Sequence, residues 1–272
     1  MKKFAIIVTT VLSIFLSAVI SASCDIPTNL FKERMNLKKR YEKEIGNDYL
    51  RNKEKADLYI KQIKEIDSRY RDVIYSLLYE AELNENKIFS ECCNNVNEDK
   101  ILFFVCNLIE YKITKDKEKF LNYVPSDKKS LEPLWILDAI IFSDPLYGKK
   151  TTSKFFDDDS FPKIFIDTVY ILATNDDSKA FDVLLRIYVF SEGEYAEYID
   201  DILLELFVNY PKLVIRNWQI VKKYEALINF ETTDYNHQAE SIIENYKNIC
   251  SGSDVNSFSC NELLEFLKKR KK

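Results

Sequence analysis

Glycine, proline and histidine are scarce in this sequence. The 272 residues include 4 Gly, 6 Pro and 1 His, against 18 Phe and 17 Tyr. An all-β chain needs many tight turns rich in glycine and proline, so these counts argue against that class. The glycines form no Gly-rich phosphate loop either. The single histidine, His237, cannot supply the paired ligands of a zinc hydrolase, so we interpret it as a surface or capping residue and expect no cofactor or metal.

Apolar and charged residues are both abundant. Hydrophobic residues make up 46% of the chain and charged residues 31%, which is enough apolar material for a packed core and is not typical of a disordered chain. The formal net charge at pH 7 is −5. A chain that is acidic as a whole is disfavoured as a nucleic-acid-binding protein.

The first 23 residues have the order of a bacterial signal peptide. Lys2 and Lys3 precede an uncharged, largely apolar run over 4–20, and small residues follow over 21–23. The run is short for a permanent span, so we expect cleavage and a mature chain without a transmembrane segment, periplasmic or secreted; an uncleaved anchor is the alternative. Cleavage before a lipidated Cys24 would instead give an inner- or outer-membrane lipoprotein. Ser21 departs from the aliphatic residue usual in lipoprotein signals, and lipidation would leave an odd number of cysteines.

The cysteines suit an oxidising compartment, where disulfides form. Cys250 and Cys260 enclose a turn-rich loop between two helical patterns, and we predict that they form a disulfide. Cys92, Cys93 and Cys106 lie on either side of another turn, "NNVNED". We expect one bridge among these three, and their spacing leaves the pairing open.

The region 24–143 is predicted to be helical. Apolar residues recur every three or four positions from Ala56 to Leu78, which indicates one long amphipathic helix. A shorter helix over 30–45 ends at Gly46 and Asn47, so the two helices should form a long antiparallel hairpin.

Two further helices are expected before the middle of the chain. One begins near Glu98 and is mostly apolar; the other begins at Ser130, which places Pro133 in its first turn, where proline is tolerated. The stretch 144–160 is then predicted to be an irregular connection to a C-terminal helical region over 161–272.

The C-terminal region has a repeated helix-turn-helix pattern. "DDSKAFDVLLRIYVF" begins with capping acids and predicts a helix, "SEG" a turn, "EYAEYIDDILLELFVNY" a second helix, and Pro211 begins a third. Such short connections leave apolar faces that must stack on neighbours. Residues 176 to about 225 resemble a HEAT-type repeat of exported bacterial helical proteins. The resemblance implies an all-α fold of hairpins stacked as an irregular HEAT-like solenoid, a scaffold for partners that brings no catalytic residues.

Two charged surfaces are candidate partner-binding sites. The helix after the "SEG" turn contains acids and no basic residue; Glu197, Asp201 and Glu205 are spaced as one ridge along it. Mutual repulsion along such a ridge is what a basic partner would relieve. The other acids of this stretch are Glu192, Glu194 and Asp200.

The second surface is the basic run Lys268, Lys269, Arg270, Lys271 and Lys272, which complements a helix dipole or, alternatively, contacts an anionic envelope surface. Asp157, Asp158 and Asp159 are interpreted as a solvated loop before a helix, with contact to a cation or a basic partner as the alternative.

These observations favour a non-enzymatic, exported helical-repeat protein that acts as a protein-binding module in the bacterial cell envelope. The alternative is a periplasmic immunity or inhibitor protein that neutralises a toxin or hydrolase. It would bind its partner through the same kind of surface, but the partner would be one specific protein. A hydrolase that uses carboxylates alone is the third hypothesis, and the sequence marks no pair of acids for it.

Overall fold

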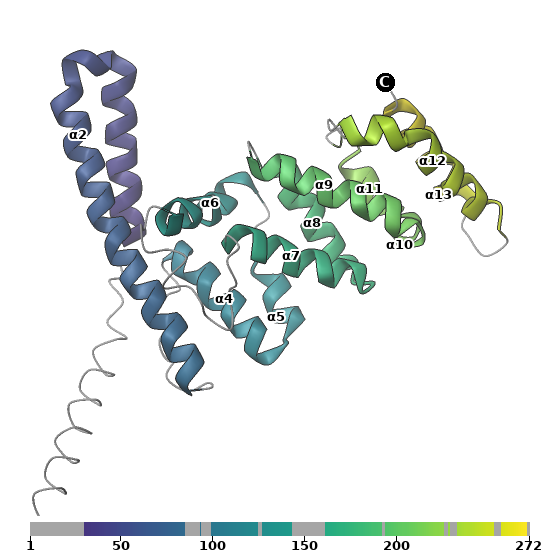
Figure 1. Ribbon diagram of the computed structural model, residues 1–272, viewed down its shortest axis with the longest axis horizontal. Helices are drawn as coiled ribbons and strands as arrows, with labels where there is room; N and C mark the ends of the chain where they lie inside the picture. Colours follow the sequence, from purple (N-terminus) through teal and green to yellow (C-terminus); the bar gives the residue numbers. More distant parts are fainter. Residues whose placement is uncertain are drawn as a thin grey trace, which may run out of the picture. The chain divides into compact units, whose positions relative to one another are not determined.

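The computed structural model describes residues 30–84, 93, 99–124, 127–142, 161–191, 194–225, 228, 233–252 and 257–270. Within these residues every regular element is a helix, which confirms the all-α prediction (Figure 1). The predicted signal peptide, Cys24 and the 144–160 connection lie outside them. The chain divides into two compact units, 1–116 with 133–161, and 117–132 with 162–272.

The first unit is built on helix α2 (Leu30–Asn84), which folds back on itself as a hairpin. The sequence predicted a first helix that ends at Gly46 and Asn47, and this end was wrong, because α2 continues through both residues. Figure 1 shows its two arms side by side. The side-chain amide of Asn52 donates to the carbonyl of Glu44 at 3.4 Å, a contact that a straight helix could not make over eight residues. Near the base of the hairpin, Arg34 meets Asp67 although 33 residues separate them.

Helix α4 (Lys100–Thr114) packs against α2 and is mostly buried from Ile101 to Ile109. Its Ile101, Leu102, Leu108 and Ile109 side chains have no exposed surface. The pair Cys93 and Cys106 lies at disulfide distance, with a Cα–Cα separation of 5.7 Å, so the structure selects one of the pairings that the sequence left open. Cys92 lies outside the described residues.

Helix α6 (Lys128–Phe142) differs from its prediction at its first turn. The helix begins two residues earlier than Ser130, because Asp127 accepts hydrogen bonds from both the backbone N–H and the hydroxyl of Ser130, at 2.9 and 2.8 Å. Pro133 therefore lies inside the helix, beyond the first turn, and its expected first-turn position was wrong.

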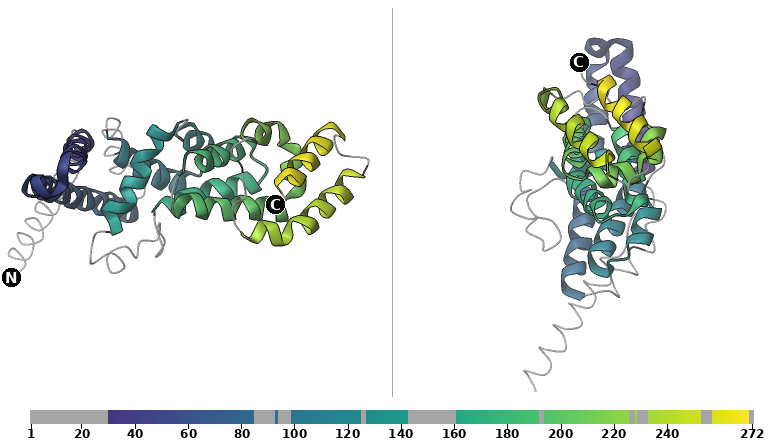
Figure 2. Two further views of the ribbon diagram at one scale, coloured as in Figure 1. Left: turned by 90° about the horizontal axis from the view of Figure 1, so that it is seen from above. Right: turned by 90° about the vertical axis from the view of Figure 1, so that its right-hand side faces the viewer.

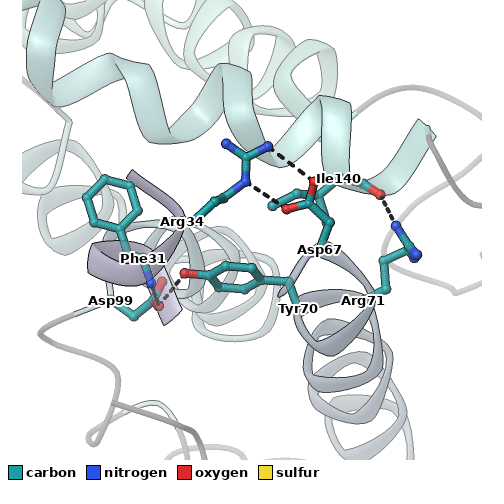
Figure 3. Close-up of polar contacts among 7 residues, drawn as sticks. All are labelled: Phe31, Arg34, Asp67, Tyr70, Arg71, Asp99 and Ile140. Atoms are coloured by element: carbon teal, nitrogen blue, oxygen red, sulfur yellow. Dashed lines mark hydrogen bonds and ion pairs between the residues drawn. The ribbon is translucent and has the colours of Figure 1, made fainter. Parts of the chain in front are cut away.

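Two buried polar contacts join the arms of α2 to the start of α4 (Figure 3). Arg34 binds Asp67 through two nitrogens, at 2.7 and 3.2 Å, with both side chains only 10% exposed. Asp99 caps α4 by accepting from the backbone N–H groups of Ile101 and Leu102, both at 3.1 Å, and it also accepts from the hydroxyl of Tyr70 at 2.6 Å. The Asp99 carboxylate thus ties the start of α4 to the second arm of α2.

The second unit consists of short helices in succession. They are α5 (Lys117–Asn122), α7 (Phe161–Thr174), α8 (Ser178–Phe190), α9 (Glu194–Asn209), α10 (Pro211–Arg216), α11 (Trp218–Lys223), α12 (Thr233–Cys250) and α13 (Ser257–Arg270). Helix α8 contacts α5, α9 and α11; α9 contacts α10 and α12; and α13 contacts α10, α11 and α12. Helices α8 and α9 thus each pack on one another and on a later helix of the chain.

The third predicted helix of the repeat is divided. The pattern from Pro211 indicated one helix, but α10 ends at Arg216 and α11 begins at Trp218. Between them Asn217 is 4% exposed, and its side-chain amide donates to the carbonyl of Leu213 at 3.0 Å. An asparagine that bonds back to the preceding turn competes with continuation of the helix.

The last two helices form an antiparallel pair joined by the predicted disulfide (Figure 2). Cys250 ends α12 and Cys260 lies in the first turns of α13, with a Cα–Cα distance of 5.7 Å. Tyr246 of α12 is fully buried and donates its hydroxyl to the carbonyl of Phe207 in α9 at 2.9 Å. The disulfide ties α12 to α13, and the hydrogen bond ties α12 to α9.

Candidate functional site

The acidic ridge lies on the exposed face of α9. Glu197, Asp201 and Glu205 are all exposed, and their spacing of four residues places them about 6 Å apart along the helix axis. The helix turns this face outward because its other face is apolar and fully buried. The side chains without exposed surface on that face are Ile199, Leu203, Leu206 and Phe207.

The remaining acids of this stretch do not extend the ridge. Asp200 is 5% exposed, so it belongs to the buried side of α9. Glu192 and the side chain of Glu194 lie outside the described residues, and their place in the ridge stays a prediction. The described ridge therefore consists of Glu197, Asp201 and Glu205.

Helix α7 lies along α9 and adds aromatic groups to this surface. The hydroxyl of Tyr198 in α9 donates to Asp167 of α7 at 2.5 Å, and the Lys163 ammonium lies 5.2 Å from the centre of the same ring. The rings of Tyr170 and Tyr210 meet edge to face at 6.4 Å. The residues of α7 and of α9 in these contacts both increase in number from one end of the pair to the other, so the two helices run in the same direction.

Tyr170 connects the aromatic groups to the ridge. Burial raises the pKa of its hydroxyl, and the neighbouring Glu205 carboxylate raises it further by opposing a second negative charge. The Tyr170 hydroxyl therefore stays protonated beside Glu205 at any physiological pH. One helical position away, Ile171 leaves 55% of its side chain exposed. The ridge carboxylates and the Tyr170 phenol thus lie close together, and aromatic groups beside charges are common at protein contacts.

A second set of charges links the other helices of the unit and is occupied by internal contacts. Asp182 of α8 pairs with Arg186 at 3.2 Å and Lys223 at 3.6 Å. Glu262 of α13 accepts from the indole of Trp218 at 2.9 Å and from Lys222 at 2.5 Å. These contacts hold α8, α11 and α13 together, so we assign them to the fold.

The basic run near the end of α13 is partly structural. Arg270 donates from Nε to the carbonyl of Ile228 at 2.5 Å and from Nη2 to the carbonyl of Glu225. Lys268 pairs with Glu265 at 3.0 Å, and Lys269 is exposed. Contact of this run with an anionic surface stays a prediction.

The other predicted positions are less informative. His237 is exposed on α12, and Lys271, Lys272 and the acidic run Asp157, Asp158 and Asp159 lie outside the described residues.

Among the helices of the described residues, none is both long and apolar enough to cross a bilayer. Comparison with family models, with curated proteins and with solved structures finds no match for this chain.

Proposed function

We propose that this chain is an exported, non-enzymatic helical-repeat protein that binds a basic protein partner in the bacterial cell envelope. The observation that carries the proposal is the exposed ridge of Glu197, Asp201 and Glu205 on α9. No basic residue lies on the ridge itself, so a partner that supplies lysine or arginine gains from repulsion that the free protein cannot relieve.

The helical-repeat part of the proposal is supported by the order of contacts in the second unit. Side-chain contacts link α7 to α9, α8 lies against α9, and α12 packs on α9 in turn. Alternating helices that each contact the following pair are the arrangement of HEAT-like stacks. In such a stack the outward face of each helix is free for binding, and α9 offers its acids there.

The proposal is tested by comparing two variants with the same change of charge. The ridge variant carries Glu197→Gln, Asp201→Asn and Glu205→Gln. The control variant neutralises three other exposed acids, on α2, through Glu54→Gln, Asp57→Asn and Glu65→Gln. Each tagged protein is expressed with its own leader, and proteins bound after cross-linking in the periplasm are quantified by mass spectrometry.

We expect a stoichiometric basic protein with the wild type and the control, and roughly tenfold less of it with the ridge variant. Removal of the ridge charges should leave the unfolding midpoint equal to that of the wild type or slightly higher, because neighbouring carboxylates of the ridge repel one another. Equal capture by all three proteins would contradict the ridge as the binding surface.

Export and the fate of Cys24 form a separate part of the proposal. Two cysteine pairs at disulfide distance are compatible with a protein that matures outside the cytoplasm. We propose that Cys24 remains a thiol available for pairing and that the mature chain has no lipid anchor. Incorporation of a fatty-acid analogue that disappears in Cys24→Ser would show the opposite.

A further inference from the structure

A groove of about 480 Å³ opens where helices of the second unit end. It lies at the last residues of α7, α9 and α12, and α10 crosses it from Pro211 to Arg216. Its lining includes Pro211, Leu213 and Ile249, together with the ring of Tyr210, which is 37% exposed. The groove therefore presents an apolar floor of the size that accommodates a small molecule.

Two cations stand on the rim of this groove. Lys212 and Arg216 lie one turn apart on α10, so they project from the same side, and both are exposed. Asp176 is the acid on the rim, and it pairs with Nη1 of Arg216. A guanidinium has five donors, so Arg216 can hold Asp176 and still donate to a second anion. The rim is thus positive by one charge in a chain whose formal net charge is −5.

We propose that this groove binds an amphiphilic organic anion, with its apolar body on Tyr210, Leu213 and Ile249 and its headgroup between Lys212 and Arg216. The ligand class is a small molecule with one carboxylate, sulfonate or phosphate group at the end of an aromatic or short aliphatic body. The cations set the sign of the headgroup, and the volume limits the body to about the size of two fused rings with a substituent. This groove shares Tyr210 with the aromatic groups beside the ridge, but it contains none of the three ridge acids and does not depend on a protein partner.

The probe for the test is 8-anilinonaphthalene-1-sulfonate, and its neutral counterpart is N-phenyl-1-naphthylamine, which has the same body without the sulfonate. Fluorescence titrations of the folded full chain measure both dissociation constants. The groove predicts one saturable site per chain and tighter binding of the sulfonate than of the neutral compound. Decanoate should displace the sulfonate competitively.

Variants with opposite expected effects separate the groove from nonspecific dye binding. Lys212→Glu should weaken the sulfonate about tenfold and leave the neutral compound unchanged, because only the headgroup loses a cation. Asp176→Asn should tighten the sulfonate a fewfold, because it frees Arg216; its backbone has a φ of 69°, which asparagine also adopts readily. Lys247→Glu, on the exposed surface of α12, is the matched control and should change neither constant.

Equal binding of the two dyes by the wild type would overturn the proposal. So would a Lys212→Glu protein that binds the sulfonate as tightly as the wild type, or an Asp176→Asn protein that binds it more weakly. Circular dichroism of each variant shows that the native helix content is retained, so that exposed apolar surface of a partly unfolded chain is not counted as the groove.

Discussion

The Asp99 side chain, which caps α4 and accepts from Tyr70, should contribute several kcal/mol to the stability of the first unit. Asp99 is 2% exposed and Tyr70 has no exposed surface, so neither group can exchange its partner for water. Asp99→Ala removes the cap of α4, at about 0.5 to 2 kcal/mol, and leaves the Tyr70 hydroxyl buried without its acceptor, at about 1 to 3 kcal/mol. We therefore expect a loss of about 2 to 4 kcal/mol in the free energy of unfolding.

Tyr70→Phe separates these two contributions. The Asp99 carboxylate then keeps the backbone N–H groups of Ile101, Leu102 and Phe31, at 3.1, 3.1 and 3.3 Å, so this variant should lose only about 1 to 2 kcal/mol. Urea unfolding followed by circular dichroism measures both variants and their combination. Because the two groups share one hydrogen bond, the double variant should lose less than the sum of the single losses, by about 1 kcal/mol or more. Strictly additive losses would show that this hydrogen bond does not contribute as described.

Three further predictions concern the second unit. Replacing Cys250 and Cys260 by serine should lower the free energy of unfolding by about 2 to 3 kcal/mol, because the short loop between them is no longer closed in the unfolded chain. A peptide map of the unreduced wild type, cut between the two cysteines, should show the two fragments still joined. Separate fragments would refute the bridge. Tyr246→Phe should cost about 1 kcal/mol in urea unfolding, because the Phe207 carbonyl loses a buried donor; an unchanged midpoint would argue against that contact. For Asp177, burial raises the pKa, but hydrogen bonds from Lys117 and the backbone of α8 outweigh burial and hold the pKa below its usual range. A carboxyl group whose pKa is lower in the native state than in the unfolded state stabilises the fold at pH values above its unfolded pKa. That contribution is lost as the pH falls through the native pKa, so the free energy of unfolding of Asp177→Asn should fall less steeply than that of the wild type below about pH 4. The same dependence of stability on pH in both proteins would contradict this prediction.

Most of the helical architecture could be predicted because it follows local rules. The cap at Asp177 accepts from the N–H groups of Lys179 and Ala180, at 3.0 and 3.1 Å, as an aspartate before a helix usually does. The apolar spacing predicted the amphipathic helix of α2 from Ala56, whereas the end predicted at Gly46 was wrong because the helix continues through it. The ridge followed from a spacing of four residues, and the side chains of Glu197 and Asp201 do face outward together.

The remaining features depend on residues that only the tertiary fold brings together. Asp99 meets Tyr70 across 29 residues, and no local pattern distinguishes either of them. The break at Asn217 arises from a side chain turning back on its own helix, whereas the apolar spacing continues unbroken through it. Tyr170 comes from α7 and Tyr210 follows α9, so their approach to the ridge could not be predicted from the composition of α9 alone.

The most direct test of the central claim is the salt dependence of partner binding. The basic protein recovered from the periplasm is titrated against wild type, the ridge variant and the α2 control by biolayer interferometry between 50 and 300 mM salt. Over this range the Debye length, the distance over which exposed charges interact, falls roughly twofold. We predict that wild type and control bind equally and lose affinity steeply with salt, and that the variant lacking Glu197, Asp201 and Glu205 charges binds about tenfold more weakly with a shallower slope. The same affinity and slope for all three proteins would contradict binding through the α9 ridge.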